Sequence, residues 1–390
     1  MQNKMTTIRV AAILFLGIFS GCEEEIILDP SLDVDTYAKR FMEKYDVPGL
    51  AFCLIRDGEV SSQHYFGLAD KKSKRVVDNR SVFSFASLSK PVTATAVLIA
   101  HSEGVLSLDD DINDYLPEEL RNPWYPDSQI TFRQLLNHTS SLVSPPDIVL
   151  QDIGIPSMPP EGGDSSVSLA ELFATLSQQS EAFKTQFLFR ERPPGSRMEY
   201  SNLGYALAGY GLELASGVTF AQYCQDHLFD PLGLQSFTWY VEDTDKERLV
   251  TPYEAGKELK PYGMPELPAG GLRGTVYDYA RFMTLYLKPA GGLIPEDLMH
   301  EAMTSEYIAD GWGLGWSFTD FNLDPYNGEN GWHNGAMPGG ASIAVFNPNS
   351  GNGYVAATNQ LTPQGGMAME FLSGMQFELG AKLAQEVNLY

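Results

Sequence analysis

The pattern of apolar and polar positions predicts strands at both ends of the chain and helices in its middle. Apolar residues recur at helical spacing over residues 33–45, which indicates an amphipathic helix. Residues 50–55 and 63–66 predict two strands, joined across the Arg56-Asp57-Gly58-Glu59 turn. The apolar stretch at residues 92–100 predicts a buried helix.

Further along the chain, the pattern changes twice. Helices are expected at residues 203–215 and 277–287, and a long surface loop rich in Pro, Gly and Ser at 141–168. From residue 311 onward, Gly-rich strands are expected at 312–318, 341–346 and 354–358, followed by a closing helix at 371–387. The first and last parts can therefore pair into one sheet, with the helical middle inserted between them.

Composition limits the classes of function. The chain has 390 residues, of which 43 % are apolar and 19 % charged, so a disordered or coiled-coil protein is excluded. Its net charge of −24 repels nucleic-acid phosphates, so no nucleic acid is expected as a partner. Three cysteines exclude a disulfide scaffold. Cys53 lies in a strand-like segment and Cys224 in a helix-like one, and two buried free thiols are expected rather than a bridge.

The N-terminus is predicted to be a targeting segment. Lys4 and Arg9 precede ten apolar residues at 10–19. These are too few to span a hydrocarbon layer of ~30 Å, but they fit a secretory signal. Ser20-Gly21-Cys22 resembles a bacterial lipoprotein cleavage box. Residues 1–21 are therefore predicted to be a signal peptide, Cys22 a lipidated residue and 22–32 a tether, which places the protein in the bacterial cell envelope, held at a membrane by lipid. The alternative is an ordinary signal with an incidental Cys22.

Motifs for several kinds of site are absent from the sequence. There is no HExxH, CxxC, Walker-type GxxxxGK[ST] or EF-hand loop, and no GxSxG nucleophile elbow. The six histidines have no ligand spacing, and Asp109-Asp110-Asp111 is expected to be a solvated turn. We therefore expect neither a metal nor a cofactor.

Three short motifs carry candidate chemistry. Ser87-Leu88-Ser89-Lys90 is an S-x-x-K motif at a helix start, where residues three apart share one face, so the Lys90 amine can lie beside the Ser87 hydroxyl. A serine needs a base to become nucleophilic, and lysine can be that base only if burial or a helix N-terminus lowers its pKa. Tyr200-Ser201-Asn202 and His333-Asn334-Gly335 follow downstream. Each motif alone is also compatible with an ordinary turn or helix start.

In this order, the motifs resemble those of the serine β-lactamase and penicillin-binding-protein superfamily, in particular its class C β-lactamase-like branch. Other segments from about residue 33 to the end are similar to that branch, among them Val47-Pro48-Gly49-Leu50-Ala51, Leu135-Leu136-Asn137-His138-Thr139-Ser140 and Pro268-Ala269-Gly270-Gly271-Leu272. The resemblance implies an α/β (α+β) fold, in which an antiparallel β-sheet flanked by helices is built from about 33–95 and 270–390. A mostly helical region at about 96–269 is inserted.

The resemblance also implies roles in an acyl-enzyme mechanism. Ser87 attacks a carbonyl, and Lys90 and Tyr200 share the acid/base work, for which nearby cations must lower the phenol pKa of Tyr200. The backbone N–H groups of Ser87 and Ala336 form the oxyanion hole. Among the substrate-binding residues, Asn202 binds the substrate amide or steadies Lys90. His333 supports Tyr200 and binds a substrate carboxylate, and Gly335, two residues further on, also belongs to the substrate-binding site.

Two departures from the family pattern bear on function. His333 replaces the Lys of β-lactamases, a variant common in the branch's esterases and D-amino-acid peptidases. With an unperturbed pKa near ~6.5 it is expected to be mostly neutral slightly above neutral pH. The acidity of the chain favours an upward shift of this pKa, but surface charge is screened over about 8–10 Å. Ser141 replaces a usual Gly and is expected to alter only a loop. A serine hydrolase of the esterase or D-amino-acid (D-Ala) peptidase type is therefore expected first. The alternatives are a true β-lactamase and a non-hydrolytic penicillin-binding-protein-like lipoprotein that binds cell-wall ligands.

Overall fold

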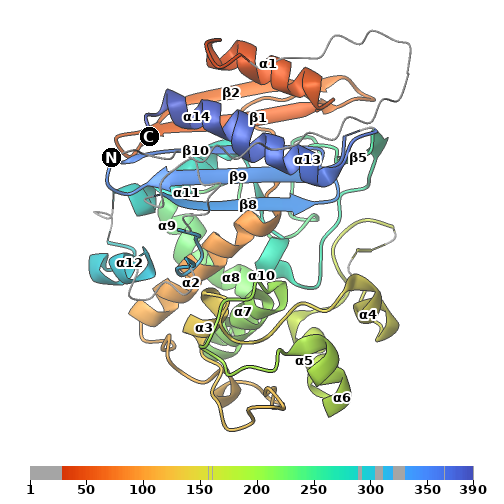
Figure 1. Ribbon diagram of the computed structural model, residues 1–390, viewed down its shortest axis with the longest axis vertical. Coiled ribbons are helices and arrows are strands. Elements are labelled where there is room, and N and C mark those ends of the chain that lie inside the picture. The colour runs from red at the N-terminus through yellow and green to blue at the C-terminus, as the bar shows by residue number, and fades with distance from the viewer. Residues whose placement is uncertain are drawn as a thin grey trace, which may run out of the picture.

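One antiparallel sheet joins early and late parts of the chain. The computed structural model describes residues 29–156, 158–159, 161–288, 292–303, 311–318, 330–363 and 365–389. Its six strands have the order β3-β2-β1-β10-β9-β8, and β1 pairs antiparallel with β10 (Figure 1). The predicted antiparallel sheet flanked by helices is confirmed. The strands are β1 (Gly49–Arg56), β2 (Glu59–Asp70), β3 (Arg75–Val76), β8 (Gly331–Met337), β9 (Gly340–Asn347) and β10 (Asn352–Thr358).

Helices cover both faces of this sheet because its central strands are apolar on both sides. In β1, Phe52 belongs to one hydrophobic core and its neighbour Cys53 to the other, since successive strand side chains point to opposite faces. One face packs against α1 (Val34–Lys44) and the C-terminal helices, and the other against α11 (Val276–Leu287) (Figure 1). The C-terminal helices are α13 (Ala368–Ser373), η5 (Gly374–Leu379) and α14 (Gly380–Glu386).

The helix α2 (Ser89–Ser102) connects the sheet with the inserted helical region. It is buried over Ser89 to Ala100, as expected for a helix enclosed by protein on all sides. It packs against α7 (Asn202–Ser216) and α10 (Leu267–Gly270). The other longer helices are α3 (Phe132–Leu136), α4 (Asp147–Asp152), α5 (Leu169–Ser177), α8 (Phe220–Cys224) and α12 (Glu296–Met303).

The segment at residues 312–318 is a turn, so the strand expected there is wrong. It makes only single bridges, between Trp312 and Ser317 and between Ser317 and Trp332. Gly315 has a φ of +99°, and a Cβ at this position would lie 2.8 Å from the Cβ of Ala94 in α2. The segment turns at Gly315 so that it can pack closely against α2, and it is therefore not extended.

The predicted surface loop at residues 141–168 is only partly one. It contains α4, and its first residues, Ser141 to Val143, are buried. Ser141 has a left-handed φ of +64°, which explains why glycine is favoured there, and its Oγ accepts a hydrogen bond from Asn122 Nδ2 at 2.9 Å. The serine therefore does more than alter a loop, because it ties the loop to a buried asparagine.

Both predicted free thiols are found. Cys53 lies in β1 and Cys224 at the end of α8, and both are buried and unbridged. Cys22, the signal peptide at 1–21 and most of the tether lie outside the described residues, so those assignments stay predictions. Within the described part of the chain, no helix has the length and apolarity needed to cross a bilayer.

Candidate active site

Ser87 lies where the sheet meets the helical region. It belongs to the 3₁₀ turn η1 (Ala86–Leu88), which leads directly into α2, and the preceding Ala86 has a left-handed φ of +48°. The neighbouring Ser89 is fully buried, donates to Ala86 O at 2.6 Å and accepts from the Leu272 N–H at 2.9 Å. The hydroxyl of Ser89 is therefore occupied by backbone hydrogen bonds, whereas Ser87 is half-buried and contacts Lys90.

The S-x-x-K spacing brings the Lys90 amine to the Ser87 hydroxyl. Nζ lies 3.1 Å from Ser87 Oγ and donates to the Ala269 carbonyl at 2.8 Å. Lys90 is fully buried, and its Nζ lies 4.8 Å from the centre of the Tyr200 ring. Burial lowers the pKa of the Lys90 amine to about 7, while the charge of Glu266 opposes this shift. Near neutrality, part of the amine is therefore unprotonated and can accept a proton from Ser87.

Tyr200 precedes α7 and is 39 % exposed, so a substrate can reach it. Desolvation by the surrounding protein raises the pKa of its phenol above the usual value, and a side-chain hydrogen bond with Ser87 opposes this shift. The expectation that cations lower this pKa is wrong, because desolvation outweighs the one lowering influence, the hydrogen bond with Ser87. Tyr200 is therefore a neutral phenol, suited to donating a proton.

Asn202 is the first residue of α7. Its backbone N–H donates to Ser144 Oγ at 2.8 Å. Its side-chain Oδ1 is buried and has no hydrogen-bond partner among the described residues, so this oxygen does not steady Lys90. Leaving a buried acceptor unsatisfied costs about 1–3 kcal/mol. A substrate N–H group would satisfy it.

His333 lies in β8 and is 1 % exposed. Its Nδ1–H donates to the Asn334 carbonyl at 2.6 Å, and its buried Nε2 has no partner within the described chain. Burial and, second, the charge of Lys90 lower the pKa of His333 to about 3. The upward shift expected from the acidity of the chain is wrong, because these local effects outweigh distant, screened surface charge. His333 is therefore neutral near physiological pH.

Gly335 brings β8 against the turn that carries Ser87. A Cβ at Gly335 would lie 2.2 Å from Phe85 O and 3.0 Å from Ser87 N. The Oγ of Ser342 also donates to the Phe85 carbonyl, at 2.7 Å. Because no side chain fits between them, only glycine permits this approach. The next residue, Ala336, is exposed, and the two predicted oxyanion donors thus belong to segments that touch.

An aromatic cluster that the sequence analysis missed surrounds these groups. Adjacent ring centroids lie 4.5 to 6.2 Å apart. The only available signal for His138 was its place in the family-like segment 135–140, because its contact with Tyr200 arises from tertiary structure. The cluster consists of His138, Tyr200, Tyr205, Trp312 and His333.

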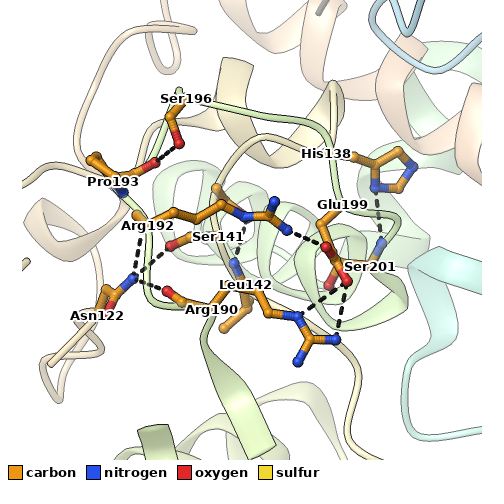
Figure 2. Close-up of polar contacts among 11 residues, drawn as sticks. Asn122, His138, Ser141, Leu142, Arg190, Arg192, Pro193, Ser196, Glu199 and Ser201 are labelled. Atoms are coloured by element: carbon orange, nitrogen blue, oxygen red, sulfur yellow. Dashed lines mark hydrogen bonds and ion pairs between the residues drawn. The ribbon is translucent and has the colours of Figure 1, made fainter. Parts of the chain in front are cut away.

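Ion pairs and an asparagine anchor the segment before Tyr200. The Glu199 carboxylate accepts from Arg190 at 3.1 Å and also pairs with Arg192 (Figure 2). The side-chain amide of Asn122 donates to the carbonyls of the same two arginines, at 2.9 and 3.1 Å. This network fixes the chain immediately upstream of the phenol.

In the described part of the chain, no group of three or more His, Cys, Asp or Glu residues is arranged to hold a metal ion. Two of the three carboxylates at residues 109–111 pair with arginines, and Asp110 accepts hydrogen bonds from the Ser107 N–H and the Tyr115 hydroxyl instead. Asp109 pairs with Arg133 at 2.7 Å and Asp111 with Arg121 at 2.7 Å.

Known proteins are similar to this chain over most of its length. The family model described as Beta-lactamase matches residues 34–373. "Penicillin-binding protein 4" of Amycolatopsis lactamdurans is 28 % identical over 364 residues, covering 87 % of each chain. A "Beta-lactamase" of Yersinia enterocolitica is 25 % identical over 291 residues, covering 73 % of this chain and 68 % of the relative. The octameric penicillin-binding protein homologue from Pyrococcus abyssi shares the fold, with a TM-score of 0.72 at 23 % identity over 91 % of this chain and 78 % of that one.

Proposed function

Because this chain belongs to the beta-lactamase family of serine hydrolases, we propose that it cleaves an ester or amide through an acyl-enzyme on Ser87. One observation carries the proposal. The Lys90 amine, with a pKa of about 7, lies 3.1 Å from the Ser87 hydroxyl. A buried amine that titrates near neutrality is the base that a serine nucleophile requires.

The order of proton transfers follows from the pKa directions. Lys90 takes the Ser87 proton while Oγ bonds to the substrate carbonyl carbon. The N–H groups of Ser87 and Ala336 hold the resulting oxyanion, at about 3–4 kcal/mol for a donor of this kind. Tyr200 gives its proton to the leaving group as the old bond breaks, and Lys90 returns a proton to Tyr200. A water molecule then cleaves the acyl bond by the same steps in reverse.

His333 favours esters and peptides over β-lactams as substrates. A neutral imidazole offers no positive charge to a substrate carboxylate, whereas the lysine usual at this position would. We therefore rank hydrolysis of an ester first, and keep beside it hydrolysis of a D-amino-acid peptide, the other activity that the resemblance implies for a histidine at this position. β-Lactam hydrolysis is the second candidate, favoured by the relatives named Beta-lactamase. The contact between Lys90 and Ser87 argues against a protein that only binds cell-wall ligands.

We also propose that Cys22 is lipidated and anchors the enzyme in the cell envelope. The apolar run that ends at Ser20-Gly21-Cys22 supports this proposal. A single acyl chain anchors only marginally, so stable attachment needs several. Cys22→Ser should abolish lipidation, and an unlipidated mature N-terminus at any other residue would contradict it.

Kinetics with a short-chain nitrophenyl ester test the proposed activity. Ser87→Ala should lower kcat by roughly 10³-fold or more, as loss of a nucleophile does elsewhere. Ser196→Ala is the matched control, since among the described residues the hydroxyl of this exposed serine donates a hydrogen bond only to Pro193 O, at 2.6 Å. A fluorescent penicillin tested in parallel separates the two candidate activities. Unchanged ester turnover by Ser87→Ala would refute the proposal.

A further inference from the structure

His138 is hydrogen-bonded to the backbone on both sides of Tyr200. Its ring Nδ1 accepts a hydrogen bond from the Ser201 N–H at 3.1 Å (Figure 2). Its carbonyl accepts one from the Glu199 N–H at 2.7 Å. The ring centroids of His138 and Tyr200 lie 4.5 Å apart. One residue therefore fixes the chain before the phenol, the chain after it and the ring itself.

His138 is itself firmly held. Its side chain is 1 % exposed, and its ring centroid lies 5.0 Å from those of both Tyr205 and Trp312. Its φ of +62° lies in the left-handed region, which asparagine and histidine occupy more readily than most residues. This backbone conformation and the ring packing together aim Nδ1 at Ser201.

The charge state of His138 suits a fixed acceptor rather than a proton carrier. Accepting from Ser201 N–H requires a lone pair on Nδ1, so Nε2 carries the hydrogen. Burial and, second, the charge of Lys90 lower the pKa of His138 well below its usual value. The ring thus stays neutral and keeps its acceptor, and its Nε2 makes no hydrogen bond within the described chain.

We infer that His138 is a positioning residue that aims the Tyr200 hydroxyl at Ser87 and the leaving group. This inference rests on the proposed function, in which Tyr200 transfers protons. His138 exchanges no proton and touches no reacting atom in this account. Displacing a catalytic group by about 1 Å can cost 10²-fold in rate. Loss of the contacts between His138 and the Tyr200 segment should therefore lower mainly kcat.

Two substitutions separate the hydrogen bond from the backbone conformation. Both His138→Gly and His138→Asn tolerate the left-handed φ, but only asparagine places an oxygen near the position of Nδ1. With a neutral nitrophenyl ester, His138→Gly should lower kcat by roughly 10²-fold with little change in KM. His138→Asn should recover at least tenfold of that loss. His64→Asn, in β2 beside Asp35 and outside the site, should leave kcat unchanged.

A double-mutant cycle with Tyr200→Phe is the decisive test. If His138 acts through Tyr200, His138→Gly should reduce kcat little further once the phenol is gone. An equal loss in both backgrounds, or an undiminished kcat in His138→Gly itself, would overturn the inference. Should His138→Gly fail to fold, the cycle is run with His138→Asn. A loss of kcat of up to about tenfold that disappears in the Tyr200→Phe background supports the inference, and a loss of the same size in both backgrounds overturns it. Failure of the proposed function differs from these outcomes, because Ser87→Ala would then keep its activity.

Discussion

The Lys90 amine and the Ser87 hydroxyl lie 3.1 Å apart, and no carboxylate among the described residues pairs with the amine. An ion pair would hold Lys90 charged, whereas burial, partly opposed by the charge of Glu266, lowers its pKa to about 7. The proposed reaction therefore depends on the protonation of one buried amine.

The activity should rise with pH through about 7. Below the Lys90 pKa of about 7, the amine is protonated and cannot accept the Ser87 proton; above it, the amine is free. The measurement is kcat/KM for a neutral nitrophenyl ester between pH 5 and 9, since this ratio reports groups of the free enzyme. A ratio that falls as the pH rises through 7 would contradict this assignment.

Glu266→Gln should move that midpoint to lower pH. Glu266 is 6 % exposed, and burial raises the pKa of its carboxyl to about 7. It is therefore partly ionised in the range where Lys90 titrates, and this negative charge raises the pKa of Lys90. Without this charge, the lowering effect of burial on the pKa of Lys90 is no longer opposed, so Lys90 loses its proton at a lower pH. Glu213→Gln is the matched control, because burial also raises the pKa of Glu213 but Lys90 is not among its neighbours. A shift toward higher pH in Glu266→Gln would show that the coupling has the opposite sign.

Gly335→Ala should damage both stability and catalysis. The added methyl would meet Phe85 O at 2.2 Å and so push β8 away from Ser87. Overpacking of this kind typically costs 1–3 kcal/mol, which thermal unfolding would record, and kcat should fall by about 10²-fold. Gly340→Ala is the control, since its nearest contact would be an ordinary 3.5 Å. Equal behaviour of the two variants would mean that the approach of β8 is unimportant.

The preference for neutral over carboxylate-bearing substrates should not change between pH 6 and 8. His333 has a pKa of about 3 and does not titrate in that range. The measurement is kcat/KM for a cephalosporin divided by kcat/KM for a neutral ester, at several pH values across this range. His333→Lys should raise the ratio by adding a positive charge. A wild-type ratio that declines with pH would mean that the imidazole carries a proton after all.

The sequence predicts those parts of the site that depend on local spacing. Ser87 and Lys90 are three residues apart on one helical stretch, so their contact follows from helix geometry. The apolar run at residues 50–55, followed by the turn at 56–59, likewise predicts β1 and its hairpin partner β2. The turn at residues 312–318 was mistaken for a strand because its apolar residues pack against α2, which local pattern does not reveal.

The pKa directions of Tyr200 and His333 could not be predicted in this way. Both shifts are caused mainly by burial, and that of His333 also by the charge of Lys90, and only the folded chain brings these groups together. His138 and Tyr200 are in contact although they lie 62 residues apart in the sequence. Such a contact leaves no periodic pattern of apolar residues from which it could be predicted. Motif order therefore indicates the family, whereas the electrostatics of the site require the structure.

Mass spectrometry of the enzyme labelled with a fluorophosphonate probe tests the central claim most directly. The account predicts a single adduct, on the peptide that carries Ser87, and none in Ser87→Ala. Ser89 should stay unmodified because its buried hydroxyl is bonded to Ala86 O and Leu272 N. An adduct on Ser89 or on any residue other than Ser87 would contradict the account.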